Sequence, residues 1–308
     1  MSRVLIGTCS WTEPTLLASG FYPVEANTAE KRLQFYAETF PIVEVDSTYY
    51  ALPSERNVAL WVERTPDNFT FDMKAFSLFT MHPTQARALP RSLRSQLPQQ
   101  AAPKPSLYHR DVPQDIQAAL WESFRQALLP LDSAGKLGVV LFQFPPWFFP
   151  GSQNQDYILG CQEKLPQYRI AVEFRNRAWL EGRRREDTFK FLREHNLIYV
   201  SVDEPQGFRS SVPPIAEATS DLAVVRFHGR NREVWEKKGI TAAERFRYLY
   251  RSEELGEWLP RITSLASQTR ETQVLMNNCY HDFAVRNARD LAGLLRADQP
   301  GLFPDAAP

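Results

Sequence analysis

Charged and polar side chains interrupt the short apolar runs of this sequence, although a strand buried on both faces is expected to be hydrophobic throughout. Glu44, Asp46 and Thr48 alternate within one run, and Glu173 and Arg175 alternate within another. Side chains two residues apart on a strand point to the same face. Because charges facing an apolar helix layer would cost too much free energy, we expect most of these groups to face a shared interior and form a ligand site.

The residue types at this site suggest general acid–base chemistry on a small sugar-like or anionic, phosphorylated ligand. Glu44 and Glu173 are the expected acid–base pair, and Arg175 beside Glu173 favours an ionised carboxylate there. Lysine and arginine side chains would bind the anionic group, a histidine would carry protons, and amide side chains would orient the ligand. The predicted catalytic residues are Glu44, Lys74, Glu173 and His228, and the predicted substrate-binding residues are Trp11, Asp46, Tyr49, Gln143, Arg175, Asp203, Arg226, Asn277 and Asn278.

A divalent-metal site is an alternative use of the same carboxylates, as in metal-dependent isomerases and phosphodiesterases with a barrel fold. The sequence contains no HxH or HExxH spacing, and cationic side chains compete for the same carboxylates, so no metal ligand is assigned. The candidate ligands would be Glu44, Asp46, Glu173, Asp203 and His228.

Lys74 and Cys9 offer two kinds of covalent chemistry. Lys74 could form a Schiff base if it is desolvated, but Asp72 precedes it on the same face, which favours a salt bridge. Cys9 could act as a nucleophile beside a histidine, although a small buried cysteine is the more common finding. Cys9 and Cys279 end the first and last expected strands, and whether they pair is left open.

A Pro-rich basic segment over residues 82–113 follows the third expected strand. It carries Arg87, Arg91, Arg94, Lys104 and Arg110, with Asp111 as its one acid. Long segments of this kind are typical of lids or mobile surface insertions. A third interpretation is therefore a non-catalytic module that binds nucleic acid or a protein through this insertion.

Strand-like and helix-like segments alternate along the whole chain, which calls for parallel strands joined by crossovers. The count of eight strands favours a closed (β/α)₈ TIM barrel over an open doubly wound sheet. We expect a single barrel domain over residues 3–297 that contains the insertion at 82–113, with a C-terminal tail at 298–308. The expected strands are Val4–Trp11, Ile42–Tyr50, Phe69–Phe76, Leu137–Phe144, Arg169–Asn176, Ile198–Asp203, Leu222–Gly229 and Thr272–Cys279.

Helical periodicity fills most of the gaps between these strands. Residues 204–220 are the exception, because prolines and a glycine replace the helix expected there. The expected helices are Ala29–Phe40, Glu55–Arg64, Asp115–Leu128, Gln155–Leu165, Glu186–His195, Glu253–Ser267 and Val285–Leu295.

The composition limits the classes of protein that remain. The chain has 308 residues, of which 43% are hydrophobic and 23% charged, so it can build a large core. Lys plus Arg and Asp plus Glu both number 36, and this balance argues against a broad nucleic-acid footprint. We expect a cytoplasmic protein, because the sequence has three cysteines, no signal-peptide pattern and no long apolar stretch. We expect no nucleotide cofactor, because no Gly-rich phosphate loop is present.

Several short motifs resemble those of one protein family. They are Ile6-Gly7-Thr8-Cys9-Ser10-Trp11, Val43-Glu44-Val45-Asp46-Ser47-Thr48-Tyr49-Tyr50, Phe142-Gln143-Phe144-Pro145-Pro146, Val172-Glu173-Phe174-Arg175, Arg226-Phe227-His228-Gly229, Tyr250-Arg251-Ser252-Glu253-Glu254-Leu255 and Asn277-Asn278. Together they resemble the YecE-like family, domain of unknown function 72, from about residue 3 to 297. The resemblance implies a TIM barrel and leaves the reaction open. Cys9 and Asp46 depart from it, standing where that family more commonly has Ser and Asn.

Overall fold

The computed structural model describes residues 2–98 and 105–299. Eight parallel strands close into one barrel, and each strand pairs with the barrel strands that precede and follow it in the chain. The barrel closes where β1 pairs with both β2 and β10. The strands of the barrel are β1 (Arg3–Thr8), β2 (Ile42–Val45), β3 (Thr70–Lys74), β6 (Leu137–Gln143), β7 (Ile170–Glu173), β8 (Ile198–Asp203), β9 (Leu222–Phe227) and β10 (Glu271–Met276). The prediction of a single-domain TIM barrel is confirmed.

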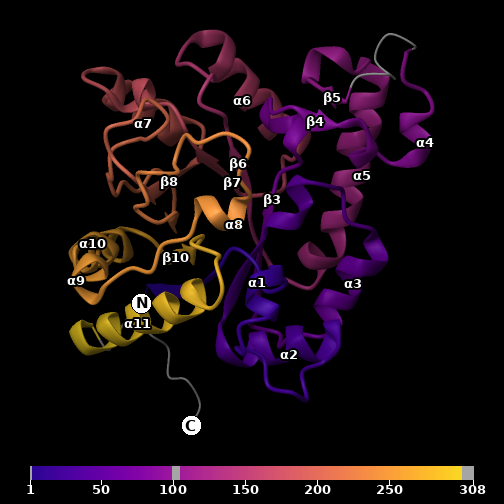
Figure 1. Cartoon of the computed structure of the whole chain (residues 1–308). Helices are drawn as coiled ribbons and strands as arrows, with labels where there is room; N and C mark the ends of the chain where they lie inside the picture. The colour runs from indigo at the N-terminus through magenta and orange to yellow at the C-terminus, as the bar shows by residue number, and fades with distance from the viewer. Residues whose placement is uncertain (1, 99–104, 300–308) are drawn as a thin grey trace.

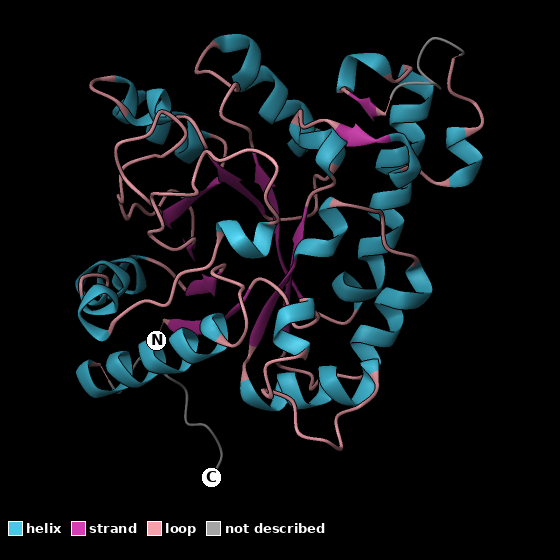
Figure 2. Cartoon of the chain, in the orientation of Figure 1, coloured by secondary structure: helices cyan, strands magenta, loops and turns pink. Residues whose placement is uncertain are grey.

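Helices surround the strands on the outside, as Figure 2 shows. In the part of the chain that the structure describes, no helix combines the length and the hydropathy needed to cross a membrane. The longer helices are α2 (Ala29–Thr39), α3 (Glu55–Glu63), α5 (Gln114–Ser133), α6 (Ser152–Lys164), α7 (Arg184–Glu194), α10 (Leu259–Gln268) and α11 (Phe283–Asp298). The shorter ones are α1 (Pro14–Leu17), α4 (Arg91–Arg94), α8 (Ala242–Arg245) and α9 (Ser252–Gly256).

Most predicted elements differ from the structure in their bounds by a few residues, and two of them differ for local reasons that the structure shows. The second strand ends at Val45 instead of Tyr50, and a 3₁₀ turn follows directly over Asp46–Tyr49. The expected helix Glu253–Ser267 is split into α9 and α10, and Pro260 lies in the first turn of α10. Proline suits a first turn because it has no N–H to donate, so a new helix starts there. Residues 204–220 form no helix, as predicted.

The described part of the insertion packs onto the barrel at the upper right of Figure 1. Its short antiparallel strands β4 (Thr84–Gln85) and β5 (Ser106–Leu107) pair with each other, and α4 lies between them in the chain. Leu89 and Leu107 are buried. Residues 99–104, which include Lys104, lie outside the described residues. Of the expected tail over residues 298–308, residues 300–308 also lie outside the described residues. Asp298, the first residue of that expected tail, belongs to α11.

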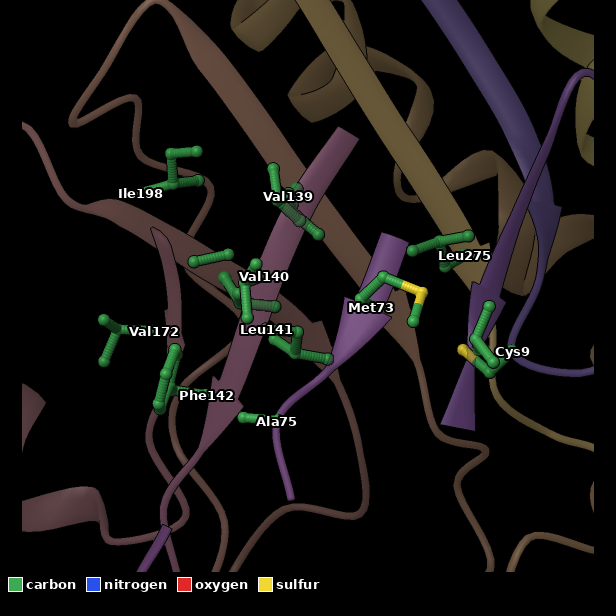
Figure 3. Packing of buried hydrophobic residues seen from close by; sticks show 14 of the residues in the cluster. Cys9, Met73, Ala75, Val139, Val140, Leu141, Phe142, Val172, Ile198 and Leu275 are labelled. Carbon is green, nitrogen blue, oxygen red and sulfur yellow. The ribbon is translucent and has the colours of Figure 1, made fainter. Parts of the chain in front are cut away.

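Apolar side chains of the strands form the core, and Figure 3 shows Val139, Val140, Leu141 and Phe142 along β6. A polar cluster interrupts this core near Gly138. The Asp72 carboxylate accepts a hydrogen bond from the Val139 backbone N–H at 3.0 Å. A Cβ at position 138 would lie 2.2 Å from Asp72 Oδ1, so only glycine leaves room for the carboxyl group.

Candidate functional site at the C-terminal ends of the strands

A fully buried ionic cluster lies inside the barrel and joins β2, β7 and β9. Arg226 binds Glu44 through both oxygens, with Nε at 2.8 Å and the second guanidinium nitrogen at 2.7 Å. Its remaining terminal nitrogen donates to Glu173 at 2.5 Å and lies 3.4 Å from the Gln143 amide oxygen. All three charged side chains have 0% exposure. We call Glu44, Arg226 and Glu173 the ionic core.

The neighbours of Glu173 keep it ionised despite its burial. Burial alone would raise the pKa of this carboxyl, but Arg226, His228 and Arg175 hold it well below its ordinary value. Arg175 approaches the carboxylate with Nε at 2.9 Å. The expectation of an ionised Glu173 agrees with this geometry. A permanently ionised carboxylate cannot act as a general acid near neutral pH.

His228 is held in one tautomer between two partners. Burial lowers the pKa of its imidazole to about 3, so the ring is neutral. Nε2 lies 3.1 Å from the Glu173 carboxylate and must donate there, while Nδ1 lies 2.8 Å from the Asn277 amide nitrogen and accepts from it. Because both ring nitrogens already have partners, His228 has no nitrogen left for the proton transfer predicted from the sequence.

Arg175 links the ionic core to a second buried acid. It donates to Glu204, whose other oxygen accepts from the Val212 backbone N–H at 2.7 Å. Burial raises the pKa of Glu204 to about 8, and the charge of Glu173 adds to this rise against the opposing effect of Arg175. The guanidinium group also lies 4.9 Å from the ring centroid of Trp235. Arg175 is thus held on three sides.

Asp46 and Lys74 lie at the barrel mouth, where β2 and β3 end, and both are half-buried. Burial raises the pKa of Asp46 to about 6, with Lys74 opposing the rise and Glu44 adding to it. Burial also lowers the pKa of Lys74, and Arg226 adds to that effect. Among the residues that the structure describes, neither side chain has an ion-pair partner within 4.0 Å. We call Asp46 and Lys74 the mouth pair.

Aromatic rings line one side of the mouth. The Lys74 ammonium lies 5.0 Å from the ring centroid of Tyr49. The His82 ring follows, 5.3 Å from Tyr49 and 5.8 Å from Trp147 between centroids. Burial lowers the pKa of His82 to about 3, so this ring is neutral as well. Tyr50 and Trp147 are 59% and 51% exposed, which leaves large ring surfaces open at the rim.

The family model described as "Protein of unknown function DUF72" matches residues 5–308 of the chain. The chain belongs to the DUF72 family. It is 32% identical over 305 residues to the UPF0759 protein YunF of Bacillus subtilis (strain 168), and the match covers 98% of both chains. The sequence resemblance to the YecE-like family is thereby confirmed.

Solved structures of DUF72 family proteins have the same fold. One from Enterococcus faecalis V583 has 25% sequence identity and a TM-score of 0.76, covering 99% of this chain and 100% of its own. Another, from Thermotoga maritima MSB8, has 29% identity and a TM-score of 0.72, covering 96% and 99%. Both are described as DUF72 family proteins, and their descriptions name no activity.

The structure brings most of the predicted site residues of this DUF72 chain together. They fall into a buried group, which surrounds the ionic core, and a half-buried group at the mouth. The buried group contains Glu44, Glu173, Arg175, Arg226, His228 and Asn277, and the half-buried group contains Asp46, Tyr49, Lys74 and Gln143.

Asp203 does not belong to either group, and the expectation that it faces the barrel interior is wrong. Its carboxylate accepts from Tyr250 Oη at 2.6 Å, Trp258 Nε1 at 2.7 Å and Arg230 Nε at 2.9 Å. Trp258 lies between α9 and α10, in the helical layer. Ser201 and Asp203 share a face of β8, as alternation requires, but alternation alone does not say which face is inside.

Two further predicted residues also pack away from the mouth. Asn278 donates from its amide nitrogen to the backbone oxygen of Tyr248 and to Asn287 Oδ1, both at 2.8 Å. Trp11 is buried against Trp61 of α3, with ring centroids 5.6 Å apart. Binding of substrate by Asp203, Asn278 or Trp11 stays a prediction that this geometry does not support.

Sequence reasoning missed Glu204, His82 and Trp235. Glu204 follows Asp203 directly, so once Asp203 is known to face outward, alternation places Glu204 inside. His82 and Trp235 lie in loops without a regular period, and the sequence carries no comparable signal for them.

The cysteines of the site are thiols. Cys9 Sγ lies 3.5 Å from Glu44 and 3.6 Å from Arg226. Burial raises its pKa well above the ordinary value, and the charge of Glu44 adds to this rise. Cys9 and Cys279 are free cysteines and do not form a disulfide with each other. A protonated, fully buried thiol is a poor nucleophile.

Proposed function

We propose that this DUF72 protein is an enzyme that uses Asp46 as its acid–base group on a small sugar-like or phosphorylated ligand. The observation that supports this best is a half-buried carboxyl group with a pKa of about 6 at the C-terminal end of a barrel strand. Active sites of TIM barrels lie at that end, and a carboxyl with such a pKa exchanges protons readily near neutral pH. Lys74, at the end of the neighbouring strand β3, supplies the opposite charge.

The ionic core has a supporting role in this proposal. Every oxygen of Glu44 and Glu173 contacts a donor, and the Arg226 guanidinium donates to both. These residues cannot reach a ligand without breaking a buried ion pair, at a cost of several kcal/mol. We therefore assign acid–base chemistry to Asp46 instead of the Glu44 and Glu173 pair, and assign anion binding to Lys74 instead of Arg226.

The ligand class follows from what surrounds the mouth pair. The half-buried Gln143 amide and the Lys74 ammonium can bind hydroxyl or phosphate oxygens. Tyr49, His82 and Trp147 form an aromatic wall against which the apolar face of a sugar ring can stack.

A thermal-shift panel tests the proposal. Purified protein is screened with pentoses, hexoses and their phosphates, and each stabilising compound is then followed by NMR for conversion to product. Asp46→Asn removes the acid–base function with little change in shape, and Asp290→Asn, an exposed residue of α11, is the matched control. We expect binding without conversion in Asp46→Asn and full conversion in the control. Equal conversion by both variants would overturn the proposal.

The same thermal-shift panel tests the metal-dependent alternative when Mg²⁺, Mn²⁺ and Zn²⁺ are added to it. Among residues 2–98 and 105–299, no group of three or more His, Cys, Asp or Glu side chains is arranged to hold a metal ion. Stabilisation by one of these metals, lost in Asp46→Asn, would favour the metal-dependent alternative over metal-free acid–base chemistry.

Two grooves at the insertion favour the alternative of a non-catalytic module that binds nucleic acid. One groove of about 500 Å³ is lined by Tyr50 and Arg87, and another of about 530 Å³ is lined by Tyr108, Arg110 and Trp147. Aromatic rings beside arginines suit the stacked bases and phosphates of a single strand. Retention of a fluorescent oligo(dT) by the wild type, lost in Arg87→Ser with Arg110→Ser but kept in Asp46→Asn, would support this alternative.

A further inference from the structure

Lys74 is unusual among the charged residues of the barrel because it is half-buried and makes no ion pair with any described residue. Asp72, its expected partner on the same strand, hydrogen-bonds to the Val139 backbone instead. The described residues offer Lys74 Nζ no hydrogen bond and no ion pair. The face of the Tyr49 ring, 5.0 Å away, is its recorded contact.

The charged groups that act on Lys74 lie on β2, in the turn after β2, on β7 and on β9. Glu44 of β2 and Glu173 of β7 are both ion-paired with Arg226 of β9, and Glu173 also pairs with Arg175. Asp46 lies in the turn after β2 and has a pKa of about 6. His82 is neutral. With burial and Arg226 lowering its pKa, Lys74 has a larger share of free amine at neutral pH than an exposed lysine has.

We propose that the Lys74 amine forms an imine with the carbonyl group of an aldehyde or ketone, so that the substrate is an open-chain sugar or a related carbonyl compound. This inference rests on the proposed function, because it places the substrate at the same mouth. The evidence for it is positional: Lys74 is a half-buried amine without a salt bridge at the end of β3, and Asp46 follows the neighbouring strand β2 at the same end of the barrel.

The step balances without an oxidant or reductant. The lone pair of Nζ attacks the carbonyl carbon and forms the C–N bond, while the C=O π electrons move to oxygen. Asp46 transfers protons from the nitrogen to that oxygen, which leaves as water when the C=N bond forms. Both hydrogens of the amine end in the water, and hydrolysis reverses the sequence.

Reductive trapping tests the proposal. The wild type is incubated with glycolaldehyde, D-glyceraldehyde, D-ribose 5-phosphate or pyruvate and sodium cyanoborohydride, and adducts are located by peptide mass spectrometry. Lys31, an exposed residue of α2 in the same chain, is the internal control. At pH 7 we expect Lys74 to be modified severalfold faster than Lys31 by at least one probe, because burial lowers the pKa of Lys74 and leaves more of it as free amine. Equal or slower modification of Lys74 with all four probes would overturn the imine.

Variants separate this inference from the proposed function. Lys74→Arg keeps the charge but has no primary amine, so the fast adduct should disappear while modification of Lys31 is unchanged. Asp46→Asn should slow the Lys74 adduct, because the carbonyl oxygen loses its proton donor. If Lys74 is not trapped but conversion of a ligand still requires Asp46, the imine fails and the acid–base proposal stands. If conversion is also independent of Asp46, both fail.

Discussion

The ionic core and the mouth pair contain the same kinds of charged side chain, yet they lie in different environments, although Glu44 and Asp46 are only two residues apart at the end of β2 and in the turn after it. In the ionic core, Arg226 joins Glu44 and Glu173 at hydrogen-bonding distance, and all three are fully buried. In the mouth pair, Asp46 and Lys74 are half-buried and make no ion pair with a described residue. The charges of the ionic core are buried and paired with one another, whereas those of the mouth pair are partly exposed and unpaired among the described residues.

This difference separates stability from chemistry. Charges in the ionic core are fixed because protonating or removing one would leave the others buried without a partner. Charges at the mouth can change protonation at small cost, because water reaches part of each side chain. The sequence groups these polar residues into one site, but the structure divides them into a scaffold, the ionic core, and a pair open to protonation, the mouth pair. The ionic core and the mouth pair should therefore respond differently to substitution.

Arg226→Met should give the largest effect, because it leaves the Glu44 and Glu173 carboxylates buried without their shared cation. We expect a loss of about 3–5 kcal/mol in the free energy of unfolding, or failure to accumulate folded protein. Urea unfolding followed by tryptophan fluorescence would measure it. Arg286→Met, an exposed position on α11, is the control and should change stability by less than about 0.5 kcal/mol. A loss below about 1 kcal/mol at Arg226 would mean that the ionic core is not a scaffold.

Glu173→Gln should have the next largest effect, with a characteristic pH dependence. The pKa of Glu173 is held well below its ordinary value, so its stabilising contribution is complete above the unfolded pKa of about 4.3. It is lost as the pH falls through the folded value. We expect the variant to be about 2–4 kcal/mol less stable at pH 7 and to lose less stability than the wild type between pH 5 and 3. Melting temperatures across this range would show whether the two curves converge.

Much of the barrel is predictable from sequence, because continuous apolar runs between turn residues mark buried parallel strands. The strand Ile198–Asp203 is the same in the prediction and the structure. The predicted second strand is too long because Asp46 and Thr48 continue the alternation of Glu44, although the backbone there turns into a 3₁₀ helix. A period of two cannot reveal the point at which a strand leaves the sheet.

The candidate site is predictable as a set of residues but not as a set of roles. The alternation of side chains groups Glu44 with Asp46, and only the structure shows that Glu44 is paired with Arg226 whereas Asp46 is half-buried without an ion pair to a described residue. Parity likewise cannot assign the face of Asp203, whose partners Tyr250 and Trp258 follow it by about 50 residues in the chain. Side-chain contacts between distant segments decide which polar groups are satisfied and which remain reactive.

Asp203→Asn should have an intermediate effect, restricted to stability. The carboxylate accepts from Tyr250, Trp258 and Arg230, so the variant should lose about 1–3 kcal/mol through weakened hydrogen bonds to a charged group. Ligand conversion and the trapping of Lys74 should be unchanged when measured well below the melting temperature. A specific loss of conversion in a fully folded Asp203→Asn protein would place this residue back in the ligand site.

Asp46→Asn should have the smallest effect on stability, and its sign is informative. The folded pKa of Asp46, about 6, lies above the unfolded value of about 3.9, so the folded state holds more protons between these values. This group therefore makes the wild type less stable as the pH rises from about 4 to 6, and the variant lacks that loss. About two units of pKa correspond to at most about 3 kcal/mol, and partial exposure to solvent reduces this, so we expect a change of about 1 kcal/mol in favour of Asp46→Asn over this range. Urea unfolding at pH 4, 5, 6 and 8 would measure it. Movement in the opposite direction would show that Asp46 is stabilised in its charged form, as a salt bridge with Lys74 would require, and the mouth pair would then be a second scaffold like the ionic core.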